Sequence, residues 1–168
     1  MVYQGGKILS EWKNGTRKRS KKVGEVGQME GFFGRYDHKL DSKGRLTLPS
    51  RFCNAFEDGA FLSSYLGGCL ALWTQIEFGI RMREMQEKAS TSAKWRNLVR
   101  VWAAGTYQAE KDSQARIIIP PHLREFAGIA SEVVISGAID HIEIWNPLRW
   151  RELEEPQERM LILGEQDI

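Results

Sequence analysis

The chain has 168 residues, enough for one domain with a sizeable core, and its 42% hydrophobic and 27% charged residues are ordinary for a globular protein. No apolar run approaches the roughly 20 residues that span a bilayer, and residues 1–28 hold no continuous apolar stretch typical of a secretory signal, so we expect a cytoplasmic protein without a membrane partner. The net charge of +2 is unevenly divided, since seven basic and two acidic residues give residues 1–28 a charge of +5 and leave −3 for residues 29–168.

Residues 1–28 are polar and basic and show no apolar periodicity. We interpret them as a flexible arm or as an extension upstream of a natural start at Met29. A basic arm would add salt-dependent affinity for phosphate groups, whereas a solvated tail would add none. Because residues 29–168 are net negative, nucleic-acid binding by this patterned region has to depend on a local basic patch.

The patterned region contains the same stretch twice. At an offset of 71 positions, the Gly, Tyr, Asp, Ser, Arg and Pro of residues 34–49 recur in residues 105–120. At an offset of 72, Leu-Ala-Leu-Trp of residues 70–73 matches Ile-Glu-Ile-Trp of residues 142–145. Two copies are too few for a solenoid, so the repeat predicts one domain with pseudo-two-fold symmetry.

The first copy, residues 29–74, has the pattern of a β-rich unit. We predict strands over residues 33–40 and 45–48, joined by a tight turn at 41–44 in which Gly44 adopts a positive φ. A short helix over residues 50–56 follows. Strands 60–65 and 69–73 then form a hairpin with Gly67-Gly68 as its turn.

Two helices in residues 75–104 link the copies. Thr74 begins a capping-box pattern for a helix to about Lys88, and Ser92 can cap a second helix over residues 93–103. The buried face of the first helix is predicted to hold Ile76, Ile80 and Met85. The second helix carries a stripe of Trp95, Leu98, Val99 and Trp102, a pattern typical of a core or a subunit interface.

The second copy, residues 105–146, repeats this order. We predict strands 106–111 and 116–119 around a turn at 112–115, a short helix after Pro120-Pro121, and strands near 132–136 and 140–145. The C-terminal segment, residues 147–168, follows Asn146, which with Pro147 begins a helix through Leu153 that Pro156 interrupts. Residues 157–168 are predicted as a short helix or tail with little to bury.

Few residues suit catalysis. The three histidines are far apart in sequence and form no metal-ligand pattern, and no Gly-rich phosphate loop follows a strand. Cys53 and Cys69 lack metal-ligand spacing and a nucleophile context, so we expect buried, reduced thiols. We therefore predict a protein that is not an enzyme, with no metal, no cofactor and no small-molecule substrate.

The repeated Asp-x-x-x-Arg is the remaining candidate. Asp41 can accept hydrogen bonds from turn amides or approach Arg45, and Asp112 and Arg116 have the same option. Two interpretations stay open: the pair clamps the turn, or the Asp orients the Arg outward toward phosphate or guanine. Basic residues around the first turn favour that copy for an anionic ligand: Arg35, His38, Lys39, Lys43, Arg45 and Arg51. At the matching positions of the second copy the one firm cation is Arg116, with Lys111 and Arg124 nearby.

Residues 41–52, Asp-Ser-Lys-Gly-Arg-Leu-Thr-Leu-Pro-Ser-Arg-Phe, preceded by Met-Glu-Gly-Phe-Phe-Gly at 29–34, resemble the opening of MraZ proteins. These are bacterial transcriptional regulators with two AbrB-like (SpoVT–AbrB) motifs, and residues 112–120 match the second motif. The resemblance implies a mainly β fold with accessory helices, a swapped-hairpin, double-split β-barrel built from two pseudo-symmetric repeats in one chain. It also implies ring-like homo-oligomers that bind short G-rich repeats in double-stranded DNA upstream of the division and cell-wall gene cluster.

We accordingly predict a sequence-specific, nucleoid-associated DNA-binding transcriptional regulator. The predicted DNA-binding residues are Arg45, Lys43, Lys39, Arg35, Arg51 and Arg116, with Asp41, Gly44 and Asp112 organising the turns. The alternative is an antitoxin-like or scaffold protein whose main partner is another protein. One position departs from the family motif: its usual Gly is Ala115 in the second copy, so that turn has to adopt another geometry or strain a non-Gly residue.

Overall fold

The computed structural model describes residues 31–163. Its strands are β1 (Arg35–Lys39), β2 (Arg45–Thr47), β3 (Ala60–Ser64), β4 (Leu70–Thr74), β5 (Tyr107–Ala109), β6 (Arg116–Ile118), β7 (Glu132–Gly137) and β8 (Ile142–Trp145). Its helices are α2 (Gln75–Thr91), α3 (Ala93–Gly105), α4 (Pro121–Ala127) and α5 (Pro147–Leu163), with short 3-10 helices η2 (Ser50–Phe56) and η3 (Leu66–Gly68). The predicted basic arm, residues 1–28, lies outside the described residues.

The strands of the two copies interleave. An antiparallel sheet has the order β1-β7-β8-β4-β3-β5, and β2 pairs with β6 in a separate two-stranded ribbon. Thus β1 of the first copy pairs with β7 of the second, and β5 of the second pairs with β3 of the first. This confirms the mainly β class with accessory helices. Within residues 31–163 the hydrogen-bonded ladders remain two sheets and do not close into one barrel.

The registers reveal a pseudo-two-fold axis. In the β2–β6 ribbon, Leu46 lies opposite Ile117, its own counterpart 71 positions later. Between β4 and β8, Ala71 lies opposite Glu143, its counterpart at the offset of 72. Each pairing is therefore one strand against its own repeat, so the sequence repeat is also a structural repeat.

The core lies where the two copies meet. Leu46 and Ile117 are almost completely buried, as are Phe56, Leu62 and Ile144. Burial of a side chain of this size contributes about 1.5–3 kcal/mol. Because both copies supply these side chains, neither copy has a complete core of its own.

Helices α2 and α3 have the predicted caps but a different buried face. Thr74 Oγ1 accepts a hydrogen bond from the Glu77 amide, and Ser92 Oγ accepts one from the Trp95 amide. Met85 is buried as predicted, but the prediction for Ile76 and Ile80 was wrong, because they are 76% and 40% exposed.

The reason for this error is an aromatic stack. The ring centroids of Phe61 on β3 and Phe78 on α2 are 4.1 Å apart, and Trp102 of α3 stacks on Phe78 at 5.5 Å. The stack turns Phe78 toward the sheet, so Ile76 and Ile80, on the other side of α2, face outward.

Helix α5 also departs from the prediction. Asn146 Oδ1 accepts a hydrogen bond from the Leu148 amide, as expected of an N-cap, but the helix continues through Pro156 to Leu163. Pro156 removes one backbone hydrogen bond, which would have gone to Glu152. Both residues are exposed, so water can hydrate the carbonyl that is left unpaired.

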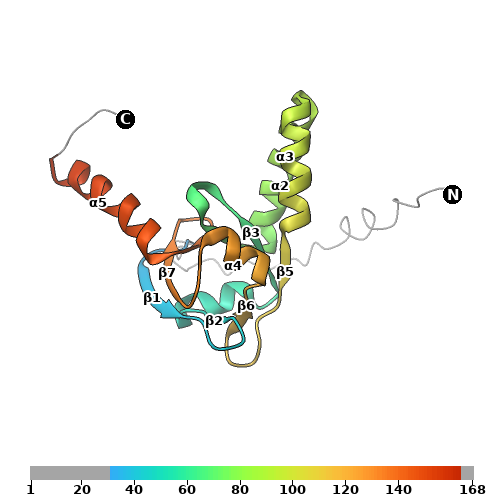
Figure 1. Cartoon of the computed structure of the whole chain (residues 1–168). Helices are drawn as coiled ribbons and strands as arrows, with labels where there is room; N and C mark the ends of the chain where they lie inside the picture. Colours follow the sequence, from blue (N-terminus) through green and yellow to red (C-terminus); the bar gives the residue numbers. More distant parts are fainter. Residues whose placement is uncertain (1–30, 164–168) are drawn as a thin grey trace, which may run out of the picture. The chain divides into compact units, whose positions relative to one another are not determined.

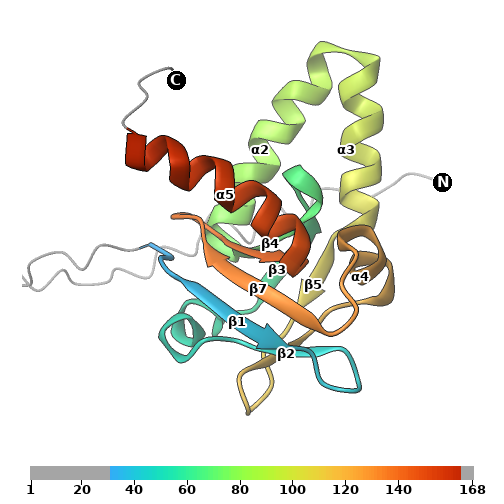
Figure 2. The ribbon, with the colours of Figure 1, turned by 60° about the vertical axis from the view of Figure 1, so that its left-hand side comes forward.

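The two Asp-x-x-x-Arg turns lie on the side of the sheet away from the α2–α3 hairpin. Figure 1 and Figure 2 both show the loops between β1 and β2 and between β5 and β6 at the lower edge of the molecule, with α2 and α3 at the upper edge. Within residues 31–163, no helix combines the length and apolar character needed to cross a membrane.

Candidate nucleic-acid interface

The first turn is organised around the carboxylate of Asp41. Its Oδ1 accepts hydrogen bonds from the amides of Lys43 and Arg45 at 2.9 and 3.0 Å, and its Oδ2 accepts one from Arg45 Nε at 2.6 Å. The Asp41 amide donates a hydrogen bond to the Arg45 carbonyl, and the Gly44 amide donates one to the Asp41 carbonyl. Asp41 therefore fixes both the loop and the Arg45 side chain.

The second turn repeats this arrangement bond for bond. Asp112 Oδ1 accepts from the amides of Gln114 and Arg116 at 2.9 Å each, and its Oδ2 accepts from Arg116 Nε at 2.8 Å. The Ala115 amide donates to the Asp112 carbonyl, as Gly44 does to Asp41. The sequence repeat thus encodes one local structure twice.

Ala115 adopts the same left-handed conformation as Gly44. Their φ angles are 58° and 75°. Of the two possibilities that the sequence left open, strain at a non-Gly residue is the one observed. A left-handed residue with a Cβ atom costs about 1–2 kcal/mol, so the second turn accepts strain to keep the geometry of the first.

The two turns are held at opposite ends of the β2–β6 ribbon. The Leu48 amide at the end of β2 donates to the Ala115 carbonyl at 2.9 Å, and the Ile119 amide at the end of β6 donates to the Gly44 carbonyl at 3.0 Å. Four or five extended residues separate the turns, roughly 15 Å. Each turn is therefore braced by the strand of the other copy.

The surrounding donors stabilise the ionised carboxylates. The backbone amide and side chain of Arg45 lower the pKa of Asp41, and the side chain and amide of Arg116 lower the pKa of Asp112 to about 2. Both turns consequently keep their charged clamp at neutral pH.

Arg45 and Arg116 are partly exposed, with 26% and 24% of their side chains accessible. Each uses Nε for its aspartate, and Nη2 of Arg116 also lies 2.7 Å from Asp112. Lys43 lies exposed within the first turn. The structure thus brings three of the predicted cations onto the two turns.

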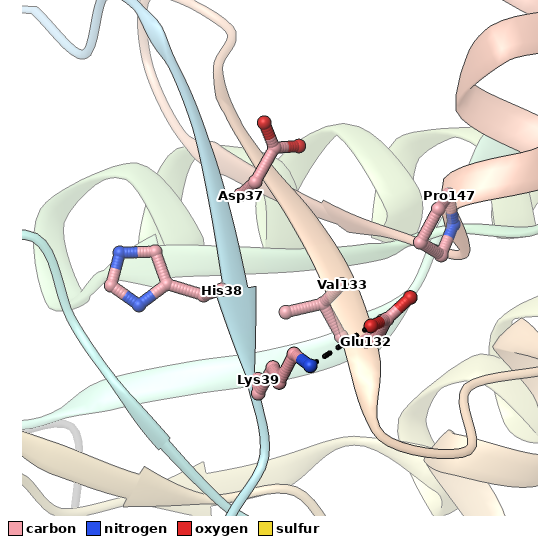
Figure 3. A pocket seen from close by; sticks show the side chains of 6 residues that line it. All are labelled: Asp37, His38, Lys39, Glu132, Val133 and Pro147. Carbon is pink, nitrogen blue, oxygen red and sulfur yellow. Dashed lines mark ion pairs between the residues drawn. The ribbon is translucent and has the colours of Figure 1, made fainter.

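The other predicted cations lie farther from the turns. Lys39, the last residue of β1, pairs with Glu132 of β7 at 3.1 Å, and both side chains are mostly exposed. Figure 3 shows this pair among the residues that line a pocket, and the lining carries both charge signs. Arg35, at the far end of β1, pairs with Glu154 of α5 at 2.6 Å. Arg51 of η2 donates to the Tyr36 hydroxyl.

Two further cations had been predicted near the second turn, and the prediction for Arg124 was wrong. Arg124 and Lys111 were grouped with the second turn, but the Arg124 guanidinium lies against Gly44 of the first turn. Lys111 Nζ donates to the Cys53 carbonyl at 2.9 Å. The interleaving of the copies, visible in the strand pairing, places α4 of the second copy beside the first turn.

Two further sequence predictions concern the cysteines and the possible metal ligands. Within residues 31–163 no cluster of His, Cys, Asp and Glu side chains could hold a metal ion. The Cys69 thiol is buried, and burial raises its pKa, whereas Cys53 is partly exposed, so the prediction of a buried thiol was right for Cys69 alone.

Comparisons with known proteins give one consistent result. A family model described as "MraZ protein, putative antitoxin-like" matches residues 32–101 and again residues 102–164. A protein of Nocardioides sp. named "Transcriptional regulator MraZ" is 40% identical over 121 residues, which cover 72% of this chain and 84% of that protein. Proteins of the same name from Saccharopolyspora erythraea and Cutibacterium acnes are 39% and 35% identical, over 76% of this chain and 90% and 89% of theirs.

Proposed function

The chain belongs to the MraZ family, and we propose on this basis that it is a sequence-specific DNA-binding transcriptional regulator. Its relatives are named as transcriptional regulators, and no enzyme name occurs among those compared above. The observation that carries the DNA-binding part is the pair of identical turns, each with an aspartate-braced arginine, at the two ends of one ribbon.

The geometry of each turn suits contact with double-stranded DNA. Because Asp41 holds Arg45 by its Nε, the other edge of the guanidinium is left for an outside acceptor. Guanine O6 and N7 in the major groove, or two phosphate oxygens, match that edge. Lys43, exposed in the same turn, would add a phosphate contact that specifies no base.

The second turn and the flanking cations would add affinity. Arg116 has the same bracing as Arg45 but fewer cations around it. Lys39 is held by an exposed ion pair, which is worth about 0–1 kcal/mol and is easily exchanged for a phosphate. Arg51 and Arg35 complete the proposed set, with Arg35 the most distant because Glu154 holds it near α5.

The proposed target is the promoter of the division and cell-wall gene cluster, bound through short G-rich repeats. One turn reads few base pairs, so specificity would come from several turns bound to successive repeats at high effective concentration. The place of action would then be the nucleoid, in the cytoplasm.

The test is a gel-shift titration with DNA from upstream of the protein's own gene and with a scrambled duplex. Arg45→Ala should abolish the preference for the upstream DNA while the thermal unfolding curve stays close to wild type. Arg116→Ala should reduce affinity less. Wild-type affinity in Arg45→Ala would remove Arg45 from the interface.

We also propose that copies of this chain assemble into a ring. The inner face of the α2–α3 hairpin packs on Phe61, and the hairpin also exposes the apolar side chains of Ile76, Ile80 and Val101 among its charged residues. Several exposed apolar side chains on one element are typical of an interaction surface. A heterologous contact, which joins two different faces, closes into a ring when the rotation allows it.

Charge complementarity favours α5 of a neighbouring copy as the element that packs on the exposed residues of the α2–α3 hairpin. Helix α3 contains Lys94, Arg96 and Arg100 and no acidic residue. Helix α5 exposes Leu148 and Leu153 and contains four glutamates within residues 152–158. Helix α5 also carries three arginines, but its glutamates lie together in residues 152–158, and this segment beside Leu148 and Leu153 suits head-to-tail contact with the basic α3.

Light scattering after size-exclusion chromatography tests the assembly. Val101→Glu places a charge on a side chain that is 72% exposed in the single chain, so the protomer should remain folded. The expected result is a fall in mass toward that of a monomer. A wild-type protein that is already monomeric would contradict the ring.

An antitoxin-like or scaffold role is the second candidate. The description of the matching family model contains that term, and an exposed apolar helix face suits a protein partner. A pull-down dominated by one small protein, together with no preference for the upstream DNA, would favour this role over the regulator.

A further inference from the structure

The first turn receives a cation from the other copy. Arg124 lies in the last turn of α4, and a Cβ atom on Gly44 would be 3.1 Å from Arg124 Cζ and 3.4 Å from its Nε and Nη1. The guanidinium therefore lies directly over the turn backbone, next to the residue that precedes Arg45. Figure 2 shows α4 beside the loop between β1 and β2.

The end of α4 fixes the backbone of Arg124. Gly128 follows the helix in a left-handed conformation with φ 65°, and the Ile129 amide donates to the Arg124 carbonyl at 2.9 Å. Arg124 Nε is buried and makes no hydrogen bond within residues 31–163. Its side chain is thus placed by packing.

Arg124 has no carboxylate partner within residues 31–163. The ion pairs of residues 31–163 engage Arg35, Lys39, Arg45, Arg81, Arg116 and His141, but not Arg124. Burying part of a guanidinium without a partner is unfavourable for the folded protein alone. Since no carboxylate of residues 31–163 engages the guanidinium, its terminal Nη atoms are free to bind an external anion.

The second turn has no equivalent of this arrangement. Seventy-one positions before Arg124 is Cys53, whose thiol donates to the Pro49 carbonyl, and the counterpart of Gly44 is Ala115. The first turn therefore combines a long side chain with a residue that has no Cβ atom, whereas the equivalent positions of the second turn are Cys53 and Ala115. Gly44 leaves space for the guanidinium.

We propose that Arg124 is a DNA-contacting residue of the first turn, which makes that site composite, with Lys43 and Arg45 from one copy and Arg124 from the other. Its ligand is a backbone phosphate of the duplex that Arg45 reads. The proposal rests on the DNA-binding function proposed above.

The experiment measures fluorescence anisotropy of the upstream duplex over a range of salt concentrations. Arg124→Met keeps the length of the side chain and removes the charge. Its Kd should rise about tenfold at moderate salt, and the slope of log K against log salt should become shallower by about 0.9, one phosphate contact. Arg124→Lys keeps the charge and should therefore retain the slope.

A purely structural role of Arg124 would change the melting temperature instead of the salt dependence of DNA binding. If Arg124 only supports the turn, Arg124→Met lowers the melting temperature and leaves the salt slope unchanged, which overturns the proposal. If the Met variant does not fold, Arg124→Gln supplies the same comparison. If the Arg124 variants bind DNA like wild type while Arg45→Ala does not bind, only the role of Arg124 is refuted. If the Arg124 variants and Arg45→Ala all bind like wild type, the DNA-binding function of the turn is refuted.

Discussion

Reciprocal substitutions at the two equivalent turn positions test the structural basis of the repeat. Ala115→Gly should stabilise the protein, because Ala115 has a φ of 58° and glycine adopts this conformation without a steric penalty. Relief of left-handed strain contributes about 1–2 kcal/mol, and the greater freedom of glycine in the unfolded chain offsets about 0.4–1 kcal/mol. The expected net gain is about 0.5–1 kcal/mol, or about 2 °C in melting temperature for a chain of this size.

The converse substitution, Gly44→Ala, should destabilise the protein for two reasons. It adds the strain that Ala115 already has, and its Cβ atom would meet Arg124 Cζ at 3.1 Å. The contacted atom is at the end of a flexible side chain, so the guanidinium can move, and we expect a total loss of about 1–2 kcal/mol.

Urea unfolding followed by circular dichroism measures both changes. Combining Gly44→Ala with Arg124→Met separates the contact with Arg124 from the backbone strain, which should remain. An unchanged or lower stability of Ala115→Gly would refute the claim that the two turns share one strained geometry.

Three further outcomes follow from the same structure. Asp112, with a pKa of about 2, contributes stability above the pH at which unfolded aspartate ionises and loses it as the pH falls from about 4 toward 2, so Asp112→Asn should unfold with less pH dependence in that range. Burial lowers the pKa of His141, but two neighbouring carboxylates outweigh burial and raise it. Protonated His141 should therefore stabilise the folded protein fully below pH 6.5, and this contribution should be lost as the pH rises through the raised pKa. An NMR titration of His141 should give a midpoint above 6.5. Leu46→Ala and Ile117→Ala, on the pseudo-two-fold axis, should each cost about 3 kcal/mol in urea unfolding, and a large difference between them would contradict that symmetry.

The sequence was sufficient for features that depend on local chemistry. Asp41 and Arg45 are four positions apart in a tight turn, so their contact could be predicted from the spacing. The caps at Thr74 and Ser92 likewise involve an amide three residues away. The repeat also predicted the symmetry, because equivalent sequences adopt equivalent structures in one core.

Features that depend on long-range packing could not be predicted in this way. The stack of Phe61, Phe78 and Trp102 decides which face of α2 is buried, and no periodicity within α2 specifies that contact. Arg124 was assigned to the wrong turn because the strands exchange partners between the copies. The solvent exposure that allows Pro156 within α5 is also a property of the folded structure.

The exchange of partners between the copies has a consequence for synthesis on the ribosome. Strand β1 pairs with β7, which is made about 100 residues after β1. The first copy must therefore leave the exit tunnel with an unpaired edge and an unfilled interior, and the pairings between the copies form only after the second copy has emerged. Such topologies fold slowly, on a scale of about milliseconds to seconds, and we expect chaperones to bind the nascent first half.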